Sequence, residues 1–200
     1  MVFRSTVRIL VGAALLALSV GCAATPAKKP GAPSVRGSVE RLQALQPSDV
    51  AVAPINDQTE QQRVPSEVFR RAFVETLIER RYSPLATHYV DANWIDASFK
   101  GTPLPDVVMT VTITAWDPSH LYSNGKVRAA AIVTLFEGGD ATGEVLWQVS
   151  LDREVDLSEG RGRPPAGDDL IPKAIRKFAQ DALEGLPLRD PLAAHAATPQ

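Results

Sequence analysis

Alternating apolar and polar residues in the second half of the chain predict a three-stranded antiparallel meander. The alternation is clearest over residues 106–116, where apolar residues form one face, as in a strand that buries one side. Turn-forming segments at 123–125 and 138–143 separate this strand from two further apolar segments, 127–136 and 144–155. The other face of the first strand carries Thr110, Thr112 and Thr114.

Two helices and two more strands are predicted around this meander. A short apolar run over 49–55 indicates a buried strand, and apolar residues at helical spacing indicate amphipathic helices over 65–82 and 170–183. Residues 85–90 are expected to form a strand and residues 91–99 a short helical turn. The charged residues expected on the solvent side of the first helix are Arg70, Arg71, Glu75, Glu79 and Arg80.

This order of elements predicts an α/β (α+β) fold. It is a mixed sheet of about five strands, in the order strand, helix, strand, three-strand meander, helix. Both helices are expected on one face of the sheet, because each apolar face must be buried against another layer.

The N-terminus has the layout of a secretory signal peptide over residues 1–21. Arg4 and Arg8 precede an apolar segment, Ile9–Val20, and Cys22 stands where cleavage is expected. An apolar run of about 16 residues is shorter than the roughly 20 that a membrane-spanning helix needs. A cleaved signal is therefore the preferred interpretation over a transmembrane anchor.

The position of Cys22 resembles a bacterial lipoprotein signal, in which the cysteine becomes the lipidated first residue of the mature chain. The segment before it reads Leu18-Ser19-Val20-Gly21, with Ser19 where the common pattern has leucine. Ala23 follows, and by this resemblance it favours transport to the outer membrane, with the domain facing the periplasm. The alternative is an ordinary secreted protein with a chance cysteine near its start.

Composition divides the rest of the chain into a tether, a domain and a tail. Residues 22–46 begin with a segment rich in Pro, Ala and Lys, so they are expected to be the lipidated Cys and a flexible tether. The α/β domain should span residues 47–188, and residues 189–200 are expected to be a disordered tail.

Charge and cysteine count exclude several classes of protein. The 200 residues carry 21 Lys+Arg and 23 Asp+Glu. Removal of residues 1–21 removes two arginines and leaves 21 − 2 = 19 basic residues against 23 acidic ones, a net charge of −4. A mildly acidic chain is not expected to bind nucleic acid. One Cys excludes both an internal disulfide and a zinc site built on several thiolates.

Four segments resemble a group of small α/β envelope proteins. They are Val50–Asp57, Leu77–Tyr82, Asp106–Thr114 and Thr142–Trp147. The group comprises the TolB amino-terminal domain, the curli-secretion lipoprotein CsgG and the penicillin-binding-protein activator lipoproteins, and the resemblance is strongest to its uncharacterised lipoprotein members. It implies binding and scaffolding in the envelope without catalysis. A second resemblance is to the auxiliary lipoprotein of lipid-transport ABC systems.

Candidate metal and catalytic residues are few. His88 and Asp91 at i, i+3 spacing, together with His120, offer ligands that zinc accepts. Their spacing matches no established zinc motif, and His195 lies in the expected tail, so surface histidines are the preferred interpretation. No metal and no cofactor is expected.

Two other charged groups are interpreted as a solvated strand face and a mobile loop. Asp152, Glu154 and Asp156 share one face of a strand, but any carboxylates at i, i+2 meet the spacing of a glycosidase pair. The segment Gly160-Arg161-Gly162-Arg163 lacks the Lys-Ser/Thr ending of a phosphate-binding loop. The motifs of serine nucleophiles are absent as well.

Aromatic residues near chain turns are the candidates for partner binding: Trp94, Trp116 and Tyr122. The alternative is that they cover the core. The threonine face of the first meander strand is a second candidate, either for a second copy or for another protein.

We therefore predict a non-catalytic outer-membrane lipoprotein with a protein-binding domain. Its partners would be periplasmic or envelope proteins, or copies of itself in a homo-oligomer. The alternative is an auxiliary subunit of an envelope lipid-transport system. A lipid carrier should contain an apolar cavity, whereas a scaffold should have a closed core and an exposed flat patch.

Overall fold

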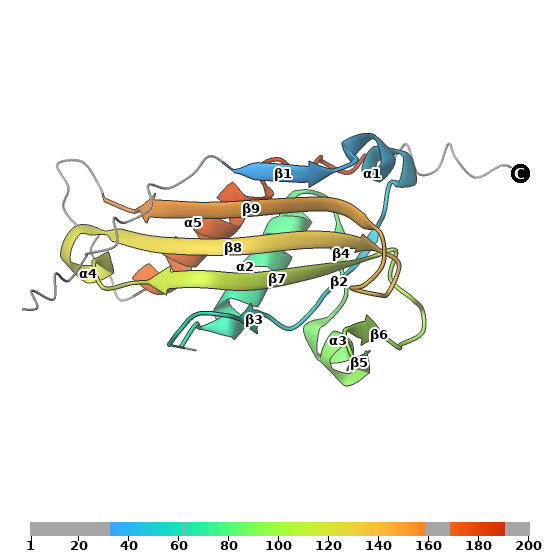
Figure 1. The fold of residues 1–200 in the computed structure, drawn as a ribbon, viewed down its shortest axis with the longest axis horizontal. Helices are drawn as coiled ribbons and strands as arrows, with labels where there is room; N and C mark the ends of the chain where they lie inside the picture. The colour runs from blue at the N-terminus through green and yellow to red at the C-terminus, as the bar shows by residue number, and fades with distance from the viewer. Residues whose placement is uncertain (1–32, 62, 159–168, 191–200) are drawn as a thin grey trace, which may run out of the picture.

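The computed structural model describes residues 33–61, 63–158 and 169–190. They form a seven-stranded mixed sheet in the order β1-β9-β8-β7-β2-β4, with β3 pairing with β7 (Figure 1). The strands in chain order are β1 (Ser34–Gly37), β2 (Asp49–Val52), β3 (Asn56–Asp57), β4 (Ser83–Pro84), β7 (Val107–Asp117), β8 (Lys126–Glu137) and β9 (Val145–Asp156).

The predicted meander is confirmed. Strands β7, β8 and β9 are consecutive antiparallel neighbours, and β2 is parallel to both β7 and β4. A short helix, α4 (Leu121–Asn124), overlaps the predicted turn at 123–125 and ends at Gly125, which has a φ of 77°. That left-handed conformation suits glycine because it has no Cβ.

Two long helices cover one face of the sheet, as predicted. They are α2 (Ser66–Glu79) and α5 (Leu170–Leu183), and Figure 1 shows both behind the strands. Their apolar stripes bury Phe69, Phe73 and Phe178 against the sheet. The rings of Phe69 and Phe178 meet edge to face, with centroids 6.1 Å apart. The main core therefore lies between this helix pair and the sheet.

The strand predicted over 85–90 is wrong. Only Ser83 and Pro84 pair with β2, and α3 (Thr87–Asn93) follows at once. Of the predicted helical turn over 91–99, residues 91–93 are helical as the end of α3, whereas the rest forms a two-stranded hairpin, β5 (Trp94–Ile95) and β6 (Ser98–Phe99).

Packing explains this difference. Val90 and Phe99 form a second buried cluster with Ala51 and Val108, which lie on the sheet face opposite the main core. A segment of six residues is too short for its apolar pattern to distinguish a strand from a helical turn, so the packing of Val90 decides between them.

The ordered domain begins before residue 47, within the segment predicted as a tether. Strand β1 pairs antiparallel with β9, and α1 (Val39–Leu45) buries Leu42 in the main core. Arg41 on α1 forms ion pairs with Glu137 and Glu144. A segment of mostly polar composition is therefore held by one buried leucine and a strand pairing.

The C-terminal end of the described chain is held against α2. The Arg80 guanidinium donates to the carbonyls of Glu184 and Leu186, and the Tyr82 hydroxyl donates to the carbonyl of Pro187 at 3.1 Å. Arg80 was expected on the solvent face, but these carbonyls partly bury it, and burial lowers its pKa.

Several predictions fall outside the described residues. These are the signal peptide over 1–21, the lipidated Cys22, the segment 160–163 and the tail from residue 191 onward. Within the described ranges, no helix is long and apolar enough to cross a membrane.

One part of the second sheet face is covered and another part is exposed. The segment from α3 to β6 covers the part near Ala51 and Val108. We call the rest of this face, on β7, β8 and β9, the open face; it points away from α2 and α5. Its central row in register is Thr112, Ile132, Ser150 and Ser34.

Candidate functional site

The three aromatic candidates do not form one surface. Trp94 is half-buried and packs on the second cluster with Phe99, whereas Trp116 is half-buried on the main core. The Trp116 ring meets Phe69 edge to face at 5.1 Å. Tyr122, on α4, is 59% exposed. Both tryptophans therefore contribute to core packing, and Tyr122 is the one of the three with a large free surface.

His88 and His120 lie on different elements. His88 is on α3 and His120 precedes α4, at the far end of β7. The described residues contain no group of three or more His, Cys, Asp or Glu that could hold a metal ion.

The three carboxylates of β9 face the basic residues of β8. Arg128 donates to both oxygens of Asp152, at 3.0 and 2.8 Å. Lys126 lies 2.8 Å from Glu154 and 3.9 Å from Asp156, and the hydrogen bond that Lys126 donates to Glu154 raises the pKa of Lys126. This ladder of ion pairs at one end of the open face agrees with the prediction of a polar surface.

The centre of the open face carries mostly short, uncharged side chains. Thr114, Ile132 and Ser150 are exposed, and Ile132, at 37%, belongs to the exposed large apolar residues. Ala130 and Thr134 flank Ile132 along β8 and are buried, with Gln148 donating to Thr134 at 3.0 Å. Short side chains around one exposed isoleucine allow a second surface to approach closely.

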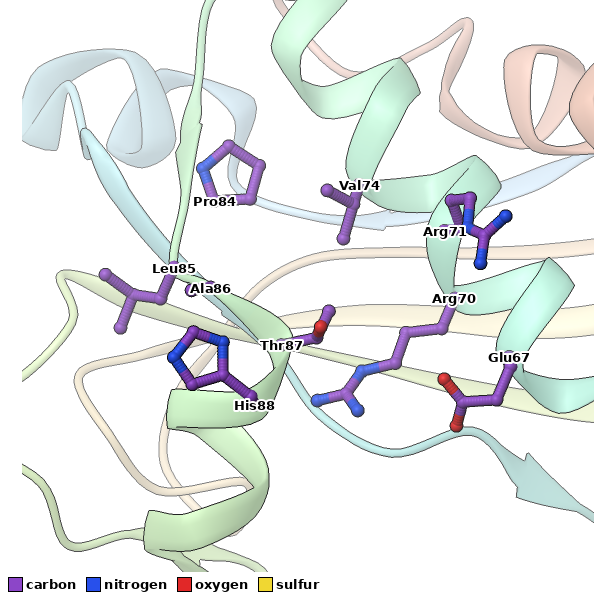
Figure 2. A pocket seen from close by; sticks show the side chains of 9 residues that line it. All are labelled: Glu67, Arg70, Arg71, Val74, Pro84, Leu85, Ala86, Thr87 and His88. Atoms are coloured by element: carbon purple, nitrogen blue, oxygen red, sulfur yellow. The ribbon is translucent and has the colours of Figure 1, made fainter.

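A pocket of about 340 Å³ lies between α2, β4 and the beginning of α3 (Figure 2). Its lining residues are Glu67, Arg70, Arg71, Val74, Pro84, Leu85, Ala86, Thr87 and His88. Four of these nine residues carry ionisable side chains. The lining differs from the continuous apolar wall that a lipid-binding cavity requires.

Arg70 is the central residue of this pocket and was wrongly predicted to lie on the solvent face. It is only 1% exposed. Its Nε and Nη2 donate to the carbonyl of Val52, at 3.1 and 2.7 Å, and its Nη1 lies 2.6 Å from Asp91. Arg70 therefore joins α2 to the end of β2 and to α3.

No sequence signal marked this arrangement. Arg70 lies next to the apolar stripe of α2, and its carboxylate partner Asp91 lies 21 residues away, in the segment expected to form a short helical turn. Neither composition nor local spacing indicates such a pair.

The comparisons with known proteins give a fold but no family. No family model matches the chain, and no curated protein matches it. Among solved structures, PelC from Paraburkholderia phytofirmans, described as a dodecamer, has a TM-score of 0.50 at 15% identity, covering 78% of this chain and 99% of PelC.

Two further solved structures resemble the chain less closely. Lipoprotein GNA1162 from Neisseria meningitidis has a TM-score of 0.44 at 13% identity, covering 70% of this chain and 99% of its own. A protein of the DUF4136 family from Bacteroides thetaiotaomicron has a TM-score of 0.40 at 14% identity, covering 77% and 95%. The PelC likeness shows a shared fold, and the two weaker ones support no further conclusion. The resemblance to the TolB and CsgG group stays a prediction.

Proposed function

We propose that this protein is a non-catalytic outer-membrane lipoprotein that is anchored through Cys22 and binds proteins in the envelope. The first partner to test is a second copy of the same chain. The anchor rests on the sequence: basic Arg4 and Arg8, the apolar segment Ile9–Val20 and Cys22 directly after it. Acyl chains on Cys22 would hold the domain at the membrane, since each buried methylene contributes about 0.8 kcal/mol.

The observation that carries the binding role is the open face. One side of the sheet is closed by α2 and α5, while Thr114, Ile132 and Ser150 stay exposed on the other. A sheet face that exposes Ile132 among short polar side chains is a surface that a protein partner can cover. PelC, which shares the fold, is described as a dodecamer, and this supports copies of the same chain as the first partner to test.

The lipid-transport alternative has less support. It requires an apolar cavity, whereas the 340 Å³ pocket beside α2 is lined by Glu67, Arg70, Arg71 and His88. We therefore keep the protein-binding function as the proposal.

Metabolic labelling tests the anchor. Cells that express the full chain would be grown with an alkyne analogue of palmitate, and the membranes would be separated. We expect label on the wild-type chain in the outer-membrane fraction and none on Cys22→Ser. A mature chain that begins elsewhere and partitions into the aqueous phase would contradict the proposal.

Crosslinking in intact cells tests the partner. We expect crosslinked species at integer multiples of the mass of the processed chain. Crosslinks to a transporter permease, without such multiples, would favour the lipid-transport alternative.

A further inference from the structure

The pocket beside α2 lies at the carboxyl ends of two parallel strands. Arg70 binds the carbonyl of Val52, the last residue of β2, and Pro84, the last residue of β4, lines the same pocket. Crevices outside the carboxyl ends of parallel strands are where open α/β sheets hold ligands. A volume of about 340 Å³ is within the range of small-molecule sites.

Arg70 has donors left over in this pocket. A guanidinium carries five N–H groups, and the structure assigns three hydrogen bonds to Arg70, two to Val52 and one to Asp91. Two N–H groups, one on each terminal nitrogen, thus have no partner among the described residues. Because the side chain is only 2% exposed, leaving these donors unpaired is costly.

The surroundings of Arg70 are mixed in charge. Figure 2 shows its guanidinium between the side chain of Glu67 on one side and those of Thr87 and His88 on the other. Arg71 lines the pocket from the next position on α2. A planar guanidinium matches carboxylate and phosphate oxygens, whereas the carboxylate of Glu67 accepts hydrogen bonds and repels an anion.

We propose that this pocket binds a small zwitterionic solute, with its phosphate or carboxylate group on Arg70 and its ammonium group on Glu67. Phosphoethanolamine has this chemistry, and it occurs both as a free solute and as a lipid headgroup. Inorganic phosphate carries only the anionic half, so it should bind more weakly.

Calorimetric titration of the full chain in detergent at low salt tests the proposal. The probes are phosphoethanolamine, inorganic phosphate and dihexanoyl phosphatidylethanolamine. We expect saturable binding of phosphoethanolamine that is at least threefold tighter than that of inorganic phosphate. Tighter binding of the short-chain lipid would assign the site to a headgroup, and equal or weaker binding would assign it to a free solute.

Glu67→Gln is expected to change the affinities for phosphoethanolamine and for inorganic phosphate in opposite directions. Glu67 is exposed, so the substitution should leave the fold intact. It should weaken phosphoethanolamine binding and tighten phosphate binding, each by two- to fivefold, about the size of one exposed charge interaction. Structural damage would weaken both probes together.

Two further variants complete the test. Arg70→Lys keeps the charge but loses the planar fork, so binding of both probes should weaken by about tenfold or more, with the unfolding temperature measured in parallel. Lys173→Ala, an exposed cation on α5, is the matched control and should change neither affinity. Absence of saturable heat, or unchanged affinities in Glu67→Gln, would overturn the proposal.

Discussion

Arg70 joins three elements through one side chain, so its replacement should destabilise the fold. Arg70→Met keeps the length of the side chain but leaves the carbonyl of Val52 without its donors. An unsatisfied buried carbonyl costs about 1–3 kcal/mol, and we expect a loss of this size in the free energy of unfolding, measured by urea denaturation.

Asp91→Asn is the control for that substitution. The Asp91 side chain is 50% exposed and Asn keeps an acceptor oxygen, so the loss should stay below about 1 kcal/mol. An equal loss in both variants would mean that the ion pair, and not the Val52 carbonyl, determines the role of Arg70.

Two glycines with positive φ provide a matched pair of substitutions. Gly37 ends β1 at a φ of 109°, and a Cβ added there would lie 2.5 Å from the carbonyl oxygen of Leu146. Gly138 has a φ of 72° and nothing within 4 Å of an added Cβ. Gly138→Ala should therefore lower the free energy of unfolding only by the strain of placing a Cβ in the left-handed conformation, about 1–2 kcal/mol.

Gly37→Ala should cost more than Gly138→Ala, because the clash with backbone must also separate β1 from β9. Amide hydrogen exchange would show this as faster exchange along β9 in Gly37→Ala alone. Equal unfolding free energies and unchanged exchange would contradict the tight contact of β1 with β9.

The two long helices are linked by a charged contact whose strength depends on pH. Arg176 on α5 donates to Glu79 on α2 at 2.6 Å, and Gln180 donates to the same carboxylate at 3.2 Å. The hydrogen bond from Arg176, followed by that from Gln180, lowers the pKa of Glu79 below its ordinary value of 4.5.

A lowered carboxyl pKa stabilises the folded state at pH values above 4.5, and this stabilisation is lost as the pH falls through the folded-state pKa. Glu79→Gln should therefore be less stable than wild type at pH 7 by less than about 1 kcal/mol, since the pair is exposed and screened by solvent. This difference in the free energy of unfolding should vanish at a pH below the pKa of Glu79 in the folded state. Urea unfolding at pH 7 and at successively lower pH values tests both expectations, and a difference that stays constant after the Glu79 carboxyl has been protonated would contradict this assignment.

At the level of elements, hydrophobic periodicity predicted the long strands and helices, but it did not predict the short elements whose formation depends on tertiary packing. The strand predicted from the alternation over 106–116 and the helices predicted from the apolar stripes of α2 and α5 are confirmed. Each of these patterns is long enough to fit the period of a strand or of a helix but not both. Strand β1 has four exposed residues and α1 buries only Leu42. Neither element leaves an apolar pattern in the sequence, so the segment resembled a tether.

At the level of the whole molecule, the candidate surfaces arise from contacts between segments distant in sequence. The threonines of β7 could be placed on one face in advance, but Ile132 and Ser150 join them only through the register of β8 and β9. Likewise, the pocket combines α2 with β4 and α3. Which face of the sheet stays open depends on where α3 and the hairpin after it pack, and that position was not predictable from local spacing.

The open face leads to a prediction about assembly. Ile132 is the exposed apolar residue in its central row, between Thr112 on β7 and Ser150 on β9. If copies of the chain associate through this face, Ile132→Arg places a charge at the centre of the interface, where it must be desolvated without a partner. In the separate chain the same arginine reaches water, so the free energy of unfolding should change by less than about 0.5 kcal/mol.

Light scattering after size-exclusion chromatography in detergent measures the outcome. We expect the wild type to be an oligomer and Ile132→Arg to have at most half its protein mass. Ile95→Arg is the matched control, because Ile95 is also an exposed isoleucine, at 53%, but lies in the β5–β6 hairpin; this variant should keep the mass of the wild type. A mass unchanged by Ile132→Arg would place the contact between copies elsewhere. A monomeric wild type would remove self-association from the proposed function, whereas the lipid anchor at Cys22 is tested separately by palmitate-analogue labelling.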